Sequence, residues 1–224
     1  MPDFQSKDPT QAGFWNERFE SQFTPWDKGG VPQALQQFVA SAQRPLVTLI
    51  PGCGLGYEAA FLAQSGWEVT AIDFSPAAVA SAQAIIGEWG THVIEADFFQ
   101  YQPTLPLELI YERAFLCALP HAVRAQIVQR WASLLPEDGL LLGFFYVDDA
   151  PERALKGPPF SISSRELYEL ISPYFELQED TEVTDSIPVF VGKERWQVWR
   201  RLANVVTTLK VVAQTNEQSD TFLV

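Results

Sequence analysis

Three glycines in a short loop and one aspartate further along the chain have the spacing that most clearly indicates chemistry. The loop, residues 51–57 (PGCGLGY), follows an uninterrupted apolar run at 46–50. Glycines tolerate positive φ and let a ligand approach the backbone where a Cβ would block it. Asp73 ends the next apolar run, 73 − 52 = 21 residues after Gly52. At that spacing a carboxylate accepts hydrogen bonds from a ribose diol, so the pattern predicts a nucleoside site.

The same loop narrows the choice of nucleoside. A dinucleotide fingerprint has glycine or alanine five positions after its first glycine, where this chain has Tyr57. The Gly-x-Gly-x-Gly pattern instead suits a nucleoside with an amino-acid tail, such as S-adenosylmethionine, and fits a nicotinamide cofactor poorly. Asp97 and Phe98 follow the third predicted strand, where a carboxylate can accept from the adenine amine and a ring can pack on the base. Taken alone, the pair is explained equally well by an ordinary turn with a core phenylalanine, but beside the glycine loop and Asp73 the ligand-binding interpretation is favoured.

Alternating strands and helices position these residues. Apolar runs predict strands, and amphipathic or proline-initiated segments predict the helices between them. Two late strands with no helix between them indicate an antiparallel hairpin at the sheet edge. The sequence therefore predicts an α/β fold with a doubly wound, mostly parallel seven-stranded sheet and a C-terminal antiparallel hairpin. The predicted strands are 46–50, 67–72, 92–95, 107–111, 140–147, 175–183 and 195–202, and helices are expected at 58–65, after Ser75-Pro76, and at 122–135 and 164–172.

Three regions follow from this pattern. Residues 1–45 form a helical segment with helices at 11–21 and 32–41, residues 46–202 form the sheet domain, and the polar residues 203–224 form a loosely attached tail. Trp15, Phe19 and Trp26 lie in the first region and could fold over a bound cofactor as a lid. The alternative is that they form the buried stripe of an amphipathic helix.

Composition excludes several classes of function. The chain has 224 residues, a net charge of −13 and 47% hydrophobic residues, which is typical of a soluble globular protein and disfavours nucleic-acid or anionic-membrane partners. Two cysteines and two histidines provide neither a disulfide framework nor a usual zinc site, so no metal is expected. The apolar runs are too short to span a bilayer. We expect a cytoplasmic monomer that acts on a small molecule.

Several longer motifs resemble a known family, the thiopurine and halide/thiol S-adenosylmethionine-dependent methyltransferases, which have the class I, Rossmann-like fold. The match covers about residues 14–202. Its motifs are FWNERFESQFTPWDKG, VTLIPGCGLGYE, EADFF, LIYERAFLCALP, LLPEDGLLLGFF and GPPFSIS.

The resemblance implies a set of cofactor-binding residues, to which the glycine loop adds Gly54. Two positions bear on the branch of the family. Position 19, commonly Trp, is Phe here, and position 113 is Arg, as in the thiopurine branch, where the plant halide/thiol branch often has Tyr. The Trp-Asp-Lys-Gly and Cys-Gly-Leu-Gly-Tyr segments look more like the halide/thiol branch. The expected set is Trp15, Phe19, Trp26, Gly52, Gly54, Asp73, Asp97, Phe98 and Arg113.

Methyl transfer from a sulfonium needs little general-base help when the acceptor is a thiolate, hydrosulfide or iodide. The catalytic residue is therefore left open, with Arg113 and Tyr146 as candidates, and Pro158-Pro159 is interpreted as a rigid wall over the site. The predicted function is S-adenosylmethionine-dependent methylation of a thiol, thiopurine or halide. The alternatives are methylation of an oxygen or nitrogen nucleophile, or a non-catalytic cofactor-binding protein that kept the fold.

Overall fold

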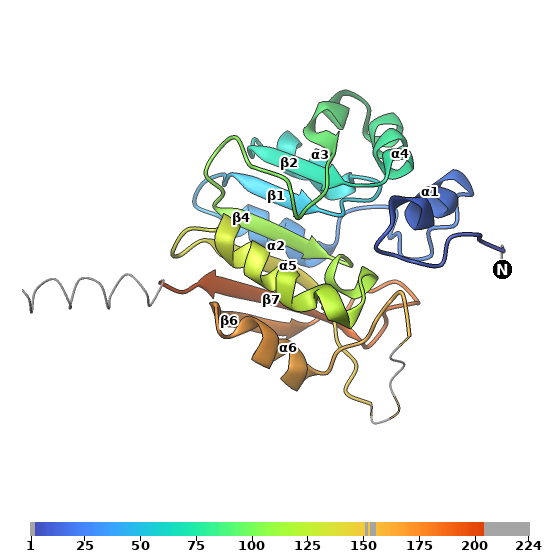
Figure 1. Ribbon diagram of the computed structural model, residues 1–224. Coiled ribbons are helices and arrows are strands. Elements are labelled where there is room, and N and C mark those ends of the chain that lie inside the picture. The colour runs from blue at the N-terminus through green and yellow to red at the C-terminus, as the bar shows by residue number, and fades with distance from the viewer. Residues whose placement is uncertain (1–2, 151, 153–155, 204–224) are drawn as a thin grey trace, which may run out of the picture.

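The protein is built on one seven-stranded sheet with helices on both faces (Figure 1). The computed structural model describes residues 3–150, 152 and 156–203. The strand order β3-β2-β1-β4-β5-β7-β6, parallel except where β7 pairs, confirms the predicted fold class. The strands are β1 (Thr48–Pro51), β2 (Val69–Asp73), β3 (Val93–Glu95), β4 (Leu109–Arg113), β5 (Leu140–Tyr146), β6 (Phe175–Glu182) and β7 (Glu194–Arg201).

Each face of the sheet has its own core, because alternate side chains of a strand point to opposite faces. In β5, Leu141 and Phe145 pack on one face under α5 (His121–Leu134) and α6 (Ser164–Ile171). Leu142 and Phe144 pack on the other face with residues of α2 (Gln33–Ser41), α3 (Tyr57–Gln64) and α4 (Pro76–Ile86). Strands buried on both faces read as continuous apolar runs, as the sequence shows.

The C-terminal hairpin lies where it was predicted. β7 is inserted between β5 and β6 and runs antiparallel to both, with β6 as the edge strand. Trp196 packs toward α2 and Trp199 toward α6, so β7 is buried on both sides. Most of β6 is exposed and acidic, which discourages pairing with another sheet.

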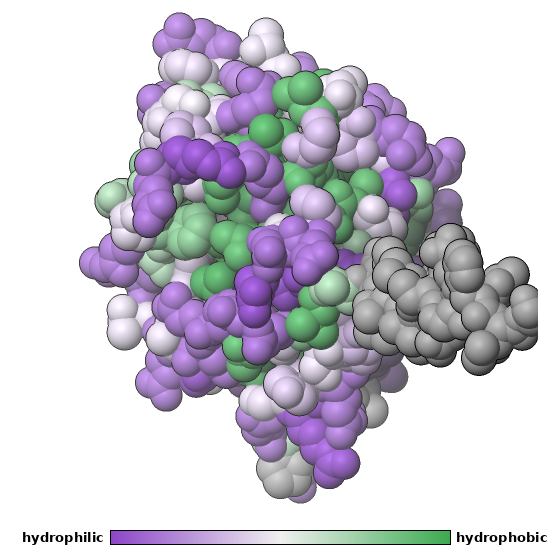
Figure 2. Space-filling model, turned by 90° about the vertical axis from the view of Figure 1, so that its left-hand side faces the viewer, coloured by the Kyte–Doolittle hydropathy of each residue, from purple (hydrophilic) through white to green (hydrophobic). Residues whose placement is uncertain are grey.

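On the side of the molecule opposite helix α1 (Ala12–Glu20), Figure 2 shows patches of hydrophobic residues among hydrophilic ones. No helix among the described residues has the length and apolar character needed to cross a membrane. The predicted tail at 203–224 lies, from residue 204 onward, outside the described residues.

Strand β4 begins two residues later than predicted and ends at Arg113. Leu107 is buried but precedes the strand, because β4 pairs with β1 and β5 only from Leu109 onward. Gly143 of β5 lies opposite Glu112, and a Cβ at this glycine would come within 1.7 Å of the Glu112 carbonyl oxygen. The close approach of these two strands therefore requires glycine at position 143.

The Glu112 carboxylate holds the turn after β4. Its Oε1 accepts hydrogen bonds from the backbone N–H groups of Phe115 and Leu116 at 2.9 and 2.8 Å. Burial raises the pKa of Glu112 to about 7, against the two backbone hydrogen bonds, which lower it. One buried acid therefore holds the turn that follows β4.

Glu112→Gln keeps an acceptor for the turn and removes the titration. From pH 4.5 to about 7 the folded wild type holds a proton that the unfolded chain releases, so wild-type stability falls as pH rises through this window. We expect the variant to gain on the order of 1–3 kcal/mol relative to wild type between pH 5 and 8. Urea unfolding across this range measures the difference, with exposed Glu137→Gln as control; parallel curves for wild type and Glu112→Gln would contradict the assignment.

Candidate functional site

A cavity of about 820 Å³ lies at the carboxyl ends of the parallel strands, with walls from the N-terminal segment and several loops. Parallel α/β sheets bind ligands at this edge. All nine cofactor-binding residues expected from the sequence line it: Trp15, Phe19, Trp26, Gly52, Gly54, Asp73, Asp97, Phe98 and Arg113.

The glycine loop after β1 needs its glycines. Gly52 and Gly54 have φ values of +60° and +53°, in the left-handed region that favours glycine. A Cβ at Gly52 would also lie 2.6 Å from the ring of Phe115. The loop is tied to β2 because the Cys53 N–H donates to the carbonyl of Ile72 at 3.1 Å. This hydrogen bond fixes the backbone of the glycine loop where the loop lines the cavity.

Asp73, at the end of β2, is the buried acid of the site, with 7% of its surface exposed. Its carboxylate accepts from the backbone N–H groups of Gly54 at 3.2 Å and Ser75 at 3.0 Å. Burial raises its pKa to about 6, although these hydrogen bonds lower it. A carboxylate has about four acceptor positions, so this one keeps capacity for the two hydroxyls of a ribose.

Asp97 and Phe98 are partly committed to local structure. Asp97 accepts from the Phe99 N–H at 2.9 Å and from the Gln100 side chain at 2.8 Å, which builds the turn after β3. The Phe98 ring is buried and packs edge-on against Phe115 at 5.1 Å. Both residues also line the cavity, so their turn and core contacts are compatible with the predicted role in ligand binding.

The aromatic residues of the N-terminal segment pack on one another over the glycine loop. The Trp15 and Phe19 rings lie edge-on to Trp26, with centroids 5.5 and 6.0 Å away. Phe19 also lies 3.8 Å from the position that a Cβ on Gly54 would take. These side chains are therefore a buried stripe and a cavity wall at once.

Arg113 enters the cavity from the end of β4 but is already paired. Its guanidinium donates to Glu58 of α3 at 2.9 Å, and both side chains are largely buried. Burial alone would lower the pKa of Arg113, but the Glu58 carboxylate raises it overall. The ion pair largely balances the positive charge that Arg113 brings to the site.

Tyr146, the other catalytic candidate, is not among the residues that line the cavity. It ends β5 and packs against Phe190, whose ring centroid lies 5.6 Å away. Phe190 itself faces the cavity, so Tyr146 supports a lining residue.

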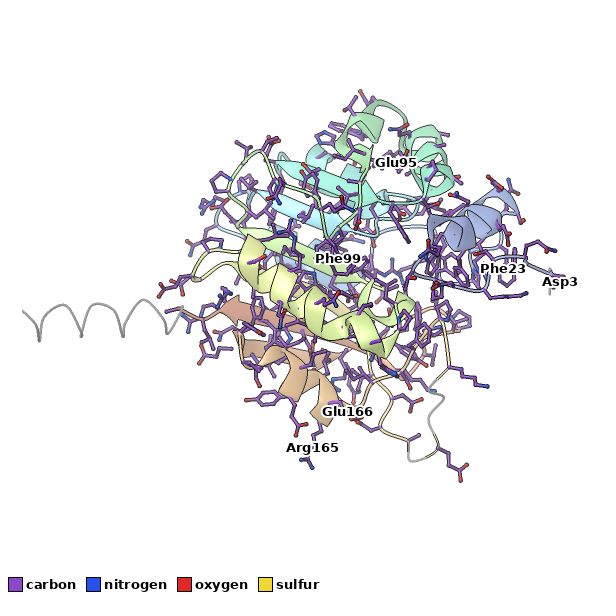
Figure 3. All side chains as sticks on the ribbon, in the orientation of Figure 1. Asp3, Phe23, Glu95, Phe99, Arg165 and Glu166 are labelled. Carbon is purple, nitrogen blue, oxygen red and sulfur yellow. The ribbon has the colours of Figure 1, made fainter. Side chains whose placement is uncertain are left out.

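Other lining residues were not expected from the sequence. Phe4 and Arg18 contribute from the N-terminal segment, and Val189 and Phe190 from the loop between β6 and β7. Figure 3 labels two further aromatics of the lining, Phe23 of the N-terminal segment and Phe99 of the loop after β3. The predicted wall residues Pro158 and Pro159 do line the cavity.

The loop between β6 and β7 reaches the cavity because it is anchored to the N-terminal segment. Lys28 and Asp185 form an ion pair at 3.0 Å, and the Gln33 N–H donates to Asp185 at 3.1 Å. These partners are more than 150 residues apart in sequence, so no local pattern could have revealed them.

Solved structures share this fold. A 1,6-didemethyltoxoflavin-N1-methyltransferase from Burkholderia thailandensis superposes with a TM-score of 0.70 at 18% identity, covering 90% of this chain and 94% of that one. Magnesium protoporphyrin IX methyltransferase from Synechocystis PCC 6803 gives 0.63 at 18% identity, covering 88% and 99%. The sheet order and these likenesses show that the chain has the class I, Rossmann-like fold of S-adenosylmethionine-dependent methyltransferases.

The family is more specific. Residues 10–210 match the family model of thiopurine S-methyltransferase, and the chain belongs to that family. Thiocyanate methyltransferase 1 of Arabidopsis thaliana is 29% identical over 200 residues, 86% of each chain. A thiopurine S-methyltransferase of Shewanella amazonensis is 31% identical over 210 residues, 82% of this chain and 93% of that one. The resemblance predicted from the motifs is confirmed.

Asp73→Asn tests the assignment of the buried acid. We expect cofactor affinity to fall by about tenfold or more, because a ribose hydroxyl loses a charged acceptor worth roughly 1.5–3 kcal/mol. In wild type, affinity should also weaken as pH falls below about 6, where Asp73 takes up a proton, and the variant should lose this dependence. Calorimetry from pH 5 to 8 measures both, with Asp138→Asn at the opposite edge as control. Unchanged affinity in Asp73→Asn would reject the role.

Proposed function

We propose that this enzyme transfers the methyl group of S-adenosylmethionine to a small, soft nucleophile: a thiol, a thiopurine or a halide. The observation that carries the proposal is that no histidine is among the described residues that line the cavity. His92 contacts the carbonyl of Val69 at 3.0 Å, at the start of β2, and His121 contacts the carbonyl of Ser161 at 2.6 Å. Neither is among the lining residues, so the acceptor must be nucleophilic without a histidine base.

The lining cysteines do not change this conclusion. Burial raises the pKa of both Cys53 and Cys117, which keeps them as neutral thiols rather than reactive thiolates. Methylation of an oxygen or nitrogen acceptor would ordinarily need a base near the methyl group. A non-catalytic cofactor-binding protein is the other alternative, and both are tested by the panel below.

The proposed cofactor contacts fit the side chains present. Asp73 would hold the ribose, the glycine loop would accommodate the amino-acid tail, and Asp97 with Phe98 would hold the adenine. When bound, S-adenosylmethionine supplies a methyl group on a good leaving group. Trp15 and Trp26 offer ring faces that favour a sulfonium cation and help to exclude water.

Orientation is then the main contribution of the protein. Holding reacting atoms about 3–3.5 Å apart supplies roughly 7–11 kcal/mol toward the barrier. We propose that residues 1–45 act as a lid on the 46–202 domain in this role. The Lys28–Asp185 ion pair supports it by joining the lid segment to a loop of the sheet domain.

The acceptor class is supported by the relatives. Names in this group include thiocyanate methyltransferase 1, probable thiol methyltransferase 2 and thiopurine S-methyltransferase. We further propose a cytoplasmic monomer without nucleic-acid partners, which the net charge of −13 and two unpaired cysteines support.

A methyl-transfer panel tests the acceptor class. The panel contains iodide, hydrosulfide, thiocyanate, an aryl thiol and a thiopurine. We expect the enzyme to methylate at least one of them at least 100-fold faster than a catechol or a primary amine. Radiolabelled methyl transfer measures each rate, and the same reaction without enzyme gives the background. Preferred methylation of the catechol or amine would contradict the proposal, and cofactor binding without any turnover would favour the non-catalytic alternative.

Glu58→Gln tests how Arg113 contributes. The amide keeps a hydrogen-bond acceptor for the guanidinium but no longer balances its charge, so anionic acceptors should bind better. We expect KM for iodide or an aryl thiolate to fall about three- to tenfold. Steady-state kinetics at saturating cofactor measure the change, with Glu68→Gln as an exposed control. An unchanged KM for anions would show that Arg113 serves the fold or the cofactor only.

A further inference from the structure

The N-terminal helix α1 is attached to the sheet domain by the side chain of Asn16. Its Oδ1 accepts a hydrogen bond from the Ser75 hydroxyl at 2.7 Å and from the Ala77 N–H at 3.3 Å. Ser75 is the N-cap of α4 and Ala77 lies in its first turn, and α1 lies beside α4 in Figure 1. Free N–H groups at a helix start need such an acceptor, so this contact satisfies α4 as well as placing α1.

The N-cap residue of α4, Ser75, also contacts the buried acid of the site. Ser75 is fully buried, its N–H donates to Asp73 at 3.0 Å, and its Oγ accepts from the Ala78 N–H at 3.1 Å. Ser75 thus bonds to Asp73 through its backbone and to Asn16 through its hydroxyl. The lid helix and the proposed ribose acceptor share one short hydrogen-bonded chain.

Asn16 also lies between the aromatic residues that wall the cavity. Trp15 precedes it and Phe19 follows one turn later, and both pack with Phe14 against Ala78 of α4. Apolar contacts tolerate sliding, whereas two hydrogen bonds to one oxygen fix the rotation and height of the helix. Asn16 therefore helps to fix the direction in which the rings face the cavity, together with the hydrogen bond from Trp15 Nε1–H to the Pro9 carbonyl at 2.8 Å.

We propose that Asn16 is a positioning residue for cofactor binding, which sets α1 over the cavity in register with Asp73. The proposal rests on the proposed function, since it takes the cofactor to lie between Asp73 and the aromatic wall. Asn16 acts through Trp15, Phe19 and Ser75 and needs no contact with the cofactor itself.

Two substitutions separate positioning from packing. Asn16→Leu keeps the side-chain volume and removes the acceptor, which leaves the buried Ser75 hydroxyl without its partner. Asn16→Asp restores an acceptor at the start of α4, where a negative charge is also favoured. Gln11→Leu, at an exposed position just before α1, is the matched control.

Calorimetric affinity for S-adenosylhomocysteine, tryptophan fluorescence and steady-state kinetics are measured on the full chain. We expect Asn16→Leu to weaken affinity about tenfold, to raise KM for S-adenosylmethionine more than it lowers kcat, and to diminish the fluorescence change on binding. Asn16→Asp should stay within about threefold of wild type, and Gln11→Leu should not differ from it.

The proposal would be overturned if Asn16→Leu kept wild-type affinity and KM. A lower melting temperature with unchanged affinity and KM would mean that the Asn16 contact is purely structural. Equal losses in Asn16→Asp and Asn16→Leu would overturn it too. If wild type bound no S-adenosylhomocysteine, the proposed function would fail before the variants were compared, so the two failures are distinguishable.

Discussion

The parallel strands β1, β2 and β4 have their carboxyl ends side by side, so the segments that follow these strands line the same cavity. Parallel pairing fixes this convergence, because the carboxyl end of each strand lies beside that of its neighbour. The loop after β1 reaches β2 through the Cys53 N–H and reaches Asp73 through the Gly54 N–H. The cavity, its backbone donors and its buried acid follow from that arrangement.

Burying acids at this edge is costly, and the chain offsets the cost locally. Asp73 and Glu112 each accept two backbone hydrogen bonds, and Glu58 is paired with Arg113. The backbone hydrogen bonds tie Asp73 and Glu112 to turns that line the site, and the ion pair ties Arg113 to α3. Fixed turns around a cavity rich in aromatic side chains suit a reaction that depends on orientation more than on proton transfer.

The features predictable from sequence are those encoded locally. The glycine loop and Asp73 were found from spacing, the helix after Ser75-Pro76 from its proline, and the C-terminal hairpin from the missing helix between two strands. Resemblance added the aromatic residues before Pro32. The beginning of β4 was misplaced because Leu107 is apolar and buried without pairing in the sheet.

Long-range partners could not be predicted. Arg113 was expected as a cofactor-binding residue and a catalytic candidate, but its partner Glu58 lies on a helix 55 residues earlier. Tyr146 was a catalytic candidate because it lies at the end of a strand. In the structure Phe190 packs on Tyr146 and lines the cavity in its place. Only the folded structure joins the loop after β6 to the N-terminal segment.

Hydrogen–deuterium exchange with and without S-adenosylhomocysteine tests most directly whether this strand edge and α1 together form the cofactor site. Exchange should slow in the glycine loop, in residues 73–78 and in α1, where the ligand and the aromatic wall would close on one another. It should stay unchanged in α6 and β6, which lie outside the cavity lining. Slowing confined to other segments, or no slowing in α1 while the ligand binds, would contradict the site described.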